Sequence, residues 1–136
     1  MTRILIDTGP LVAIASDRDA QHRQCMEQSR EIGRPMLTCW PVVTEAVWLL
    51  RNQPVSIRNL FRTFEDGTFR LASLDETDMP AIERILETYA TLRPQLADAA
   101  LVHLAEREGL NTIFTLDRRD FTVYRLSRNR SLHLIP

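Results

Sequence analysis

Short apolar runs, separated by longer segments with helical spacing, constrain the fold more than any other feature of this sequence. The first run, Arg3–Asp7, reads Arg-Ile-Leu-Ile-Asp, an unbroken apolar stretch that ends in a charge. Such a run is typical of a strand buried on both faces of a parallel sheet. Further strands are predicted over 36–39, 69–74 and 112–116, with a last edge strand over 132–135.

The segments between these runs favour helices. Helices are predicted over 11–15, 17–32, 42–51, 57–64, 82–89 and 97–108. The 42–51 segment is apolar almost all round. Strands that alternate with helices predict an α/β fold with a mostly parallel sheet of about five strands. In such sheets ligands bind beyond the carboxyl ends of the strands, so functional residues are expected there.

Length and composition fit one globular domain over residues 1–136, with 44% apolar and 26% charged residues. The longest apolar runs, Pro10–Ala15 and Ala46–Leu50, are too short to span a bilayer. The N-terminal run, broken by Asp7, is too short for a signal peptide, so a cytoplasmic protein is expected. Two cysteines are too few for a zinc finger or a disulfide scaffold. The three histidines are predicted to be ordinary surface residues.

Four acids stand at positions where a carboxylate is costly or well placed for chemistry. Asp7 ends the first predicted strand and Asp117 follows the fourth. Glu45 is the only acid in the apolar 42–51 helix, and Asp98 lies at the start of the last long helix. An unpaired buried carboxylate costs several kcal/mol, so it normally neutralises, pairs or binds a metal.

Three of these acids, and the nearby Asp120, also have a purely structural explanation, and local sequence leaves both explanations open. Asp7 and Asp98 are at positions where aspartate caps a helix. Glu45 can lie partly exposed in the first turn of its helix, where it favours the helix dipole. Asp120, three residues after Asp117, can be a solvated loop carboxylate.

Taken together, the four acids predict a pocket that binds a cation. Carboxylates at close range repel one another, and a divalent cation removes that repulsion. All-oxygen ligands suit Mg²⁺ or Mn²⁺, and two such ions about 4 Å apart stabilise both the attacking and the leaving oxygen of a phosphodiester. The hydroxyls of Thr8 and Thr115 stand beside Asp7 and Asp117 and are expected to orient these carboxylates.

The basic residues point to a phosphate backbone as substrate. All 17 are arginine, and without the four candidate ligands the net charge of −1 becomes +3. Residues 118–136 carry a local charge of +4, and its arginines are Arg118, Arg119, Arg125, Arg128 and Arg130. A basic segment beside an acidic metal site fits a nucleic-acid backbone. A solvated basic tail is the alternative.

With these features in place, the chain resembles the PIN-domain nucleases, and within them the VapC-type toxins of bacterial toxin–antitoxin pairs. The matching pieces are Ile-Leu-Ile-Asp-Thr-Gly-Pro-Leu at 4–11, Thr-Glu-Ala at 44–46, Leu-Ala-Asp-Ala-Ala-Leu at 96–101 and Thr-Leu-Asp-Arg-Arg-Asp-Phe at 115–121. Their order and spacing cover nearly the whole chain. The match is poorest over 52–72 and after Phe121.

The resemblance implies a three-layer α/β/α fold and an Mg²⁺- or Mn²⁺-dependent endoribonuclease. It assigns the catalytic and metal-binding acids to Asp7, Glu45, Asp98 and Asp117. It also matches Thr115 to a frequent hydroxyl of the family, and Asp120 to a further acid. A homodimer and a small VapB-like antitoxin that covers the site are implied as partners.

Several other functions compete with the RNase toxin. A PIN nuclease that acts in RNA processing or on structured DNA, without an antitoxin, has the same sequence features. A non-catalytic RNA- or protein-binding module remains the alternative from another class. A receiver domain needs a lysine, and this chain has none. A dehalogenase-like phosphatase needs an acid at position 9, which is Gly9, and a Rossmann domain needs a glycine motif that is absent.

Overall fold

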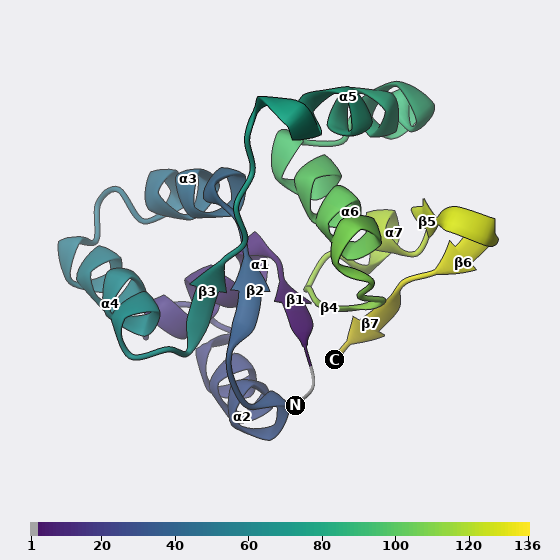
Figure 1. Ribbon diagram of the computed structural model, residues 1–136. Helices are drawn as coiled ribbons and strands as arrows, with labels where there is room; N and C mark the ends of the chain where they lie inside the picture. The colour runs from purple at the N-terminus through teal and green to yellow at the C-terminus, as the bar shows by residue number, and fades with distance from the viewer. Residues whose placement is uncertain (1–2) are drawn as a thin grey trace.

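The computed structural model describes residues 3–136. Its centre is a five-stranded sheet in the order β3-β2-β1-β4-β7, and each neighbouring pair is parallel (Figure 1). The strands are β1 (Ile4–Ile6), β2 (Met36–Thr38), β3 (Phe69–Leu71), β4 (Thr112–Phe114) and β7 (His133–Ile135). All five predicted strands are therefore confirmed, including the edge strand, and each is at least one residue shorter than predicted.

The middle strand β1 explains why the first apolar run has no polar break. Leu5 pairs with Leu37 of β2 on one side and with Ile113 of β4 on the other. Helices cover both faces of the sheet, so each residue of β1 is buried. Apolar and polar residues alternate in the strands of a sheet that exposes one face to solvent, and β1 shows no such alternation.

Within residues 3–136, seven α-helices surround the sheet, together with three short 3₁₀ turns. The helices are α1 (Thr8–Ala15), α2 (His22–Ile32), α3 (Trp40–Leu49), α4 (Pro54–Glu65), α5 (Met79–Thr88), α6 (Leu96–Glu108) and α7 (Arg118–Phe121). The 3₁₀ turns are η1 (Glu76–Asp78), η2 (Ala90–Leu92) and η3 (Ser127–Asn129).

The helices form the two outer layers of an α/β/α sandwich (Figure 1). Helix α1 packs against α2 and α4, whereas α6 packs against α5. Right-handed crossovers explain this division, because the chain first moves from β1 outward to β3 and then returns to the other side of β1 for β4. Helix α3 contacts both α1 and α6. The predicted three-layer fold is confirmed.

The helix starts differ from the prediction, by three or more residues in α1, α2, α4 and α5. Helix α1 begins at Thr8 rather than at residue 11, because the Asp7 carboxylate accepts a hydrogen bond from the Thr8 backbone N–H at 2.7 Å and caps the helix. Helix α2 begins at His22 rather than at residue 17. Residues 17–21 form a turn, in which Asp19 accepts a hydrogen bond from the Gln21 N–H at 2.8 Å.

Helix α3 is apolar almost all round, as predicted, but it is not buried all round. Its inner face holds Val42, Val43 and Ala46, while Trp40 and Trp48 are more than half exposed. Part of the apolar surface of this helix is thus left uncovered by the core of the chain.

The C-terminal region contains elements that the sequence analysis did not predict. Helix α7 is a single turn, and strands β5 (Arg125–Leu126) and β6 (Arg130–Ser131) form a small antiparallel hairpin. Segments this short show no periodicity to detect.

The prediction of ordinary surface histidines is wrong for His103. Its Nε2 lies 2.7 Å from Asp78 Oδ1, and Arg107 donates to the same oxygen at 3.1 Å. The backbone N–H of Asp75 and the contact with His103 lower the pKa of Asp78 to about 2. This cluster ties η1 to α6, and no local pattern reveals it because Asp78 is 25 residues from His103 and 29 from Arg107 in sequence.

His22 is half-buried, with Nδ1 2.7 Å from the Ala13 carbonyl oxygen, and His133 is exposed as predicted. Both cysteines are buried and free. Within residues 3–136, no helix has the length and apolarity needed to cross a membrane.

Two buried aromatic rings hold helix α7 against the body of the protein. Phe121 and Tyr124 are fully buried and pack edge-to-face, with ring centroids 5.2 Å apart. Tyr124 packs in the same way on Tyr89, at 4.9 Å. These contacts fix the position of the segment that carries Asp117 and Asp120.

We expect Phe121→Ala to lower the free energy of unfolding by about 3–5 kcal/mol, since it removes a fully buried aromatic side chain. Chemical denaturation measures this loss. Val123→Ala is the matched control, because Val123 is 43% exposed and its truncation should change stability by less than about 0.5 kcal/mol. Equal effects of the two variants would mean that Phe121 does not hold α7 in place.

Candidate active site

The site lies where strands β1 and β4 end side by side. From β1 the chain continues to β2 on one side of the sheet, and from β4 it leads to β7 on the other. Such a reversal opens a crevice at the carboxyl ends of the two strands. Asp7 follows β1 directly, and Asp117 comes three residues after the end of β4. The two acids therefore meet at this crevice although they are 110 residues apart.

An open cleft of about 500 Å³ occupies this position. Its lining residues are Asp7, Thr8, Gly9, Glu45, Arg93, Gln95, Asp98, Leu116, Asp117 and Asp120. The four predicted acids, together with Asp120, thus lie in one cleft. The two carboxylates from helices α3 and α6 reach it because both helices pack together at this edge.

Asp7 lies deepest in the cleft and is held from two sides. Its Oδ2 accepts a hydrogen bond from the Thr115 hydroxyl at 2.8 Å, and its Oδ1 accepts from the Thr8 backbone N–H at 2.7 Å. Burial nevertheless raises the pKa of Asp7, and the neighbouring charge of Asp117 adds to the rise. Asp7 is therefore both a helix cap and a member of the acidic cleft.

Asp98 is a second buried acid of the cleft. It is the third residue of α6, is only 9% exposed, and accepts a hydrogen bond from the hydroxyl of Tyr124 at 3.2 Å. Burial, followed by the charges of Asp7, Asp117 and Glu45, raises the pKa of Asp98 to about 7. Asp98 does not cap its helix, because Gln95 holds the capping position.

Asp98, Asp117 and Asp120 form the tightest group of carboxylates. Each offers an oxygen atom, and these three oxygens lie within 4.8 Å of one another. The Asp117 side chain also caps α7 by accepting from the Asp120 N–H at 3.4 Å. This short helix turns Asp120 towards Asp98, so Asp120 is part of the cluster rather than a solvated loop residue.

Glu45 lies in the middle of its helix rather than in the first turn. Helix α3 begins at Trp40, so Glu45 is its sixth residue and gains little from the helix dipole. Burial and the charge of Asp7 raise the pKa of Glu45. The Gln95 side-chain amide faces this carboxylate and, with its nitrogen towards Glu45, donates to both oxygens.

The two predicted supporting threonines behave differently. Thr115 donates to Asp7 and accepts from the Asp117 backbone N–H at 2.9 Å, so one buried hydroxyl links both acids. The expectation that the Thr8 hydroxyl orients a carboxylate is wrong. That hydroxyl is buried and has no hydrogen-bond partner among the described residues, and Thr8 holds Asp7 through its backbone instead.

Three residues of the site were not foreseen from the sequence. Arg93 and Gln95 lie in the connection between α5 and α6, which has no periodic pattern. Tyr124 is fully buried, yet a lone tyrosine in a loop gives no sign that it contacts an acid 26 residues earlier. Only their short separation from Asp98 in sequence could have drawn attention to Arg93 and Gln95.

The five arginines of the C-terminal segment are all exposed. Arg118 and Arg119 belong to α7 beside the acidic cluster. Arg125 donates to the carbonyl oxygens of Thr122, Val123 and Tyr124, while Arg130 lies 3.5 Å from Glu106. Arg128 lies in the turn of the hairpin. The predicted basic patch is thus divided between α7 and the hairpin, and none of its five arginines is among the residues that line the cleft.

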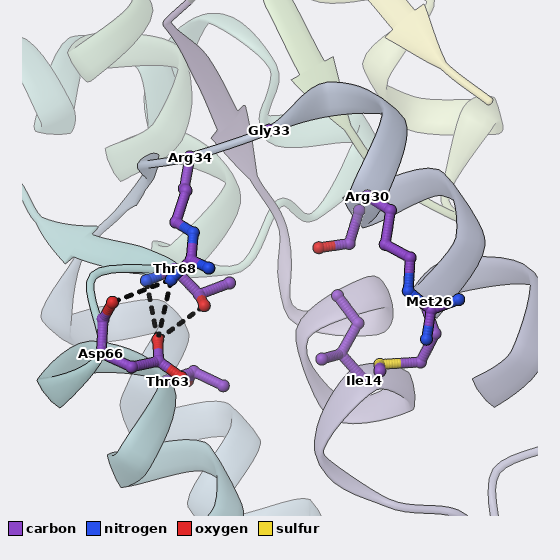
Figure 2. A pocket seen from close by; sticks show the side chains of 9 residues that line it. Ile14, Met26, Arg30, Gly33, Arg34, Thr63, Asp66 and Thr68 are labelled. Carbon is purple, nitrogen blue, oxygen red and sulfur yellow. Dashed lines mark hydrogen bonds and ion pairs between the residues drawn. The ribbon is translucent and has the colours of Figure 1, made fainter.

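A second hollow, of about 410 Å³, lies at the other end of the sheet (Figure 2). Its lining includes Arg34 and Thr68, which precede strands β2 and β3. Figure 2 shows Arg34 and Thr68 turned towards Asp66, with Arg34 donating to the Asp66 carbonyl oxygen at 2.9 Å. Asp66 is the only carboxylate among its lining residues, so it lacks the acidic cluster that marks the cleft.

The donor set of the cleft fits a hard divalent cation. Every candidate ligand is a carboxylate oxygen, the ligand type that Mg²⁺ and Mn²⁺ prefer. The raised pKa values of Asp7, Glu45 and Asp98 reflect negative charges that are buried together without a matching positive charge. A bound cation supplies that charge and favours the ionised carboxylates.

Comparisons with known proteins agree with this geometry. The PIN domain family model matches residues 4–126. Ribonuclease VapC26 of Mycobacterium tuberculosis (strain ATCC 25618 / H37Rv) is 30% identical over 138 residues, which cover 98% of this chain and 100% of VapC26. The crystal structure of Mycobacterium tuberculosis VapC20, a sarcin–ricin loop cleaving toxin, has the same fold with a TM-score of 0.73 at 16% identity. That match covers 85% of this chain and 91% of VapC20. The chain therefore belongs to the PIN-domain nucleases, in the group of the VapC proteins.

Proposed function

We propose that this protein is an Mg²⁺- or Mn²⁺-dependent endoribonuclease, the toxin of a toxin–antitoxin pair. The observation that carries the proposal is the convergence of five carboxylates in one cleft at the switch point of the sheet. The names of its relatives, a ribonuclease and an RNA-cleaving toxin, support RNA as the substrate.

The carboxylates of Asp98, Asp117 and Asp120 would hold the cation, with Asp7 and Glu45 completing the negative charge of the cleft. When bound, the cation supplies Lewis-acid activation of water and screens the charge that develops on the phosphate. Hydrolysis forms a bond between a water oxygen and phosphorus and breaks the bond from phosphorus to the 3′-oxygen. The leaving 3′-oxygen takes up a proton and becomes a hydroxyl, while the phosphate stays on the 5′-oxygen of the following nucleotide.

The remaining residues of the cleft position these groups. Thr115 fixes Asp7 and the backbone of Asp117, and Tyr124 fixes Asp98.

A homodimer and a small VapB-like antitoxin remain part of the proposal. Exposed apolar residues along α3 and at the start of α4 support a protein contact on the surface formed by these two helices: Trp40, Trp48, Leu49 and Val55. Exposed apolar patches of this kind often mark interaction sites.

The direct test is incubation of purified protein with total bacterial RNA in Mn²⁺ or Mg²⁺, and in EDTA. We expect cleavage with either metal and none with EDTA. Asp98→Asn should lower the cleavage rate more than about 100-fold, because it removes a proposed metal ligand. Loss of a residue that only hydrogen-bonds to a metal ligand already costs about 10–100-fold in activity. Circular dichroism should show an unchanged fold, because the substitution preserves volume. Full activity of Asp98→Asn, or in EDTA, would refute the proposal.

The orienting role of Thr115 gives a second prediction. Thr115→Val keeps the shape of the side chain but removes the hydrogen bonds to Asp7 and Asp117, so activity should fall about 10–100-fold. Steady-state cleavage rates measure this. Thr112→Val in strand β4, three residues before Thr115, is the control, because among the described residues the Thr112 hydroxyl bonds only to Asn111. If both variants retain wild-type activity, the hydroxyl of Thr115 does not position the acids.

The raised pKa of Asp98 predicts how the metal-free protein responds to pH. Below about pH 4 this carboxyl is protonated in both the folded and the unfolded state. Between about pH 4 and pH 7 the unfolded chain releases the proton while the folded protein retains it, so stability falls as pH rises. Above about pH 7 the loss is complete.

Thermal unfolding in EDTA across this range tests the linkage. Asp98→Asn should melt at a higher temperature than wild type at pH 8 and should lose this advantage at pH 4. Saturating Mn²⁺ should stabilise the wild type at pH 8 and have much less effect on the variant. A wild-type melting temperature that rises between pH 4 and pH 7, with no gain from the substitution at pH 8, would contradict the assignment.

A further inference from the structure

Arg93 differs from every other residue of the acidic cleft in its charge. The cleft is lined by five carboxylates, and among the described residues Arg93 is the only basic side chain in that lining. It is exposed to solvent and lies in the connection between η2 and α6, five residues before Asp98. Its charge is therefore available at the surface where a substrate enters.

The guanidinium of Arg93 is not engaged in the structure. Across residues 3–136 it makes no ion pair and donates no hydrogen bond, although it shares the cleft with five acids. Two arginines near the site are engaged: Arg118 donates to the Pro136 carbonyl oxygen, and Arg125 donates to the carbonyls that follow α7. Arg119 of α7 donates no side-chain hydrogen bond within residues 3–136, but it does not line the cleft. An arginine side chain carries five N–H donors in a planar fork, and those of Arg93 are free for a ligand.

The backbone fixes where this side chain starts. Arg93 has φ 50° and ψ 56°, a left-handed conformation, and its N–H donates to the Ala90 carbonyl oxygen at 3.0 Å. Pro94 follows, and Gln95, two residues after Arg93, faces Glu45. The short link to Asp98 therefore holds Arg93 at a set place on the rim.

We propose that Arg93 binds a backbone phosphate of the RNA strand at the rim of the cleft. This inference rests on the proposed function and deepens it. A carboxylate-lined cleft repels a polyanion. A cation bound by the acids neutralises negative charge only at the floor of the cleft, where the acids lie. A guanidinium at the rim provides a bidentate contact for phosphate oxygens, at a point where the acids are not paired with it.

The competing role for Arg93 is that of an internal counter-ion for the acids. A counter-ion would lie within ion-pair distance of a carboxylate, and Arg93 forms no such pair in the described chain. The two roles also differ in their effect on metal binding. Removing a counter-ion from the acids would tighten the binding of Mn²⁺, whereas removing a phosphate contact would leave it unchanged.

Binding of a short fluorescein-labelled single-stranded RNA, measured by anisotropy across a salt series, tests the contact. Asp98→Asn serves as the background, so that the RNA stays intact. Adding Arg93→Gln should weaken binding about tenfold, as for a hydrogen-bonded charge pair. It should also reduce the slope of log K against log salt by about 0.7, the value for one phosphate on a single strand. Arg93→Lys should keep the slope and recover part of the affinity, because lysine preserves the charge but not the fork.

Arg23→Gln in the same background is the matched control. Arg23 is 93% exposed on α2 and pairs only with Glu27, at 3.8 Å, so neither affinity nor slope should change. In the otherwise wild-type enzyme, Arg93→Gln should raise KM for RNA about tenfold and leave the Mn²⁺ affinity unchanged by calorimetry.

The outcomes separate the two proposals. If the wild type cleaves RNA but Arg93→Gln alters neither KM nor the salt slope, the role of Arg93 is overturned and the nuclease stands. Tighter Mn²⁺ binding with an unchanged slope overturns it too, in favour of the counter-ion. If the wild type cleaves no RNA while the slope still falls in the double variant, the phosphate contact stands and the nuclease proposal fails. Absence of RNA binding overturns both.

Discussion

The parallel pairing of β1 with β4 is the constraint on which the rest of the site depends. Leu5 and Ile6 lie beside Ile113 and Phe114, and the Asp7 N–H donates to the Phe114 carbonyl oxygen at 2.9 Å. This register places Thr115 opposite Asp7 at the end of the ladder. Because chain connections diverge from these two strands, the space beyond them stays open instead of being filled by a crossover.

The crevice at this point holds the acids close together, and the repulsion between their charges favours the binding of a cation. Three of the carboxylates have pKa values raised by burial and by one another, with that of Asp98 raised to about 7. Hydrogen bonds from Thr115 and Tyr124 hold two of them without neutralising their charge. A fold that only needed stability would not gather these charges. The arrangement costs stability in the absence of a cation and favours binding of one.

The proposed RNase activity divides the work between the floor and the rim of the cleft. The acids at the floor come from four separate segments of the chain, which hold them rigidly because each segment is packed in the core or capped. The rim contains Arg93, Gln95 and Leu116, which lie on connections rather than in the sheet. Residues on connections can vary without disturbing the acidic cluster, so under the proposed function the rim is where contacts that select the RNA would lie.

The sequence by itself determined the strands, most of the helices and the four acids. Those features are local, because unbroken apolar runs follow from burial on both faces and a carboxylate in an apolar helix is visible at once. It left undecided whether Asp7 caps a helix or belongs to the site, and the structure gives it both roles. It also misjudged His103 and the hydroxyl of Thr8, whose partners or lack of them depend on distant segments.

Only the tertiary structure decided which acids lie close enough to share a cation and which basic residue faces them. Asp120 joins Asp98 because a single turn of helix, held by buried Phe121 and Tyr124, rotates it into the cleft. Arg93 reaches the same cleft from a connection with no pattern of its own. Composition and periodicity reflect the local environment of each residue, such as burial and secondary structure. The distances between side chains on different segments are set by packing, which no local pattern contains.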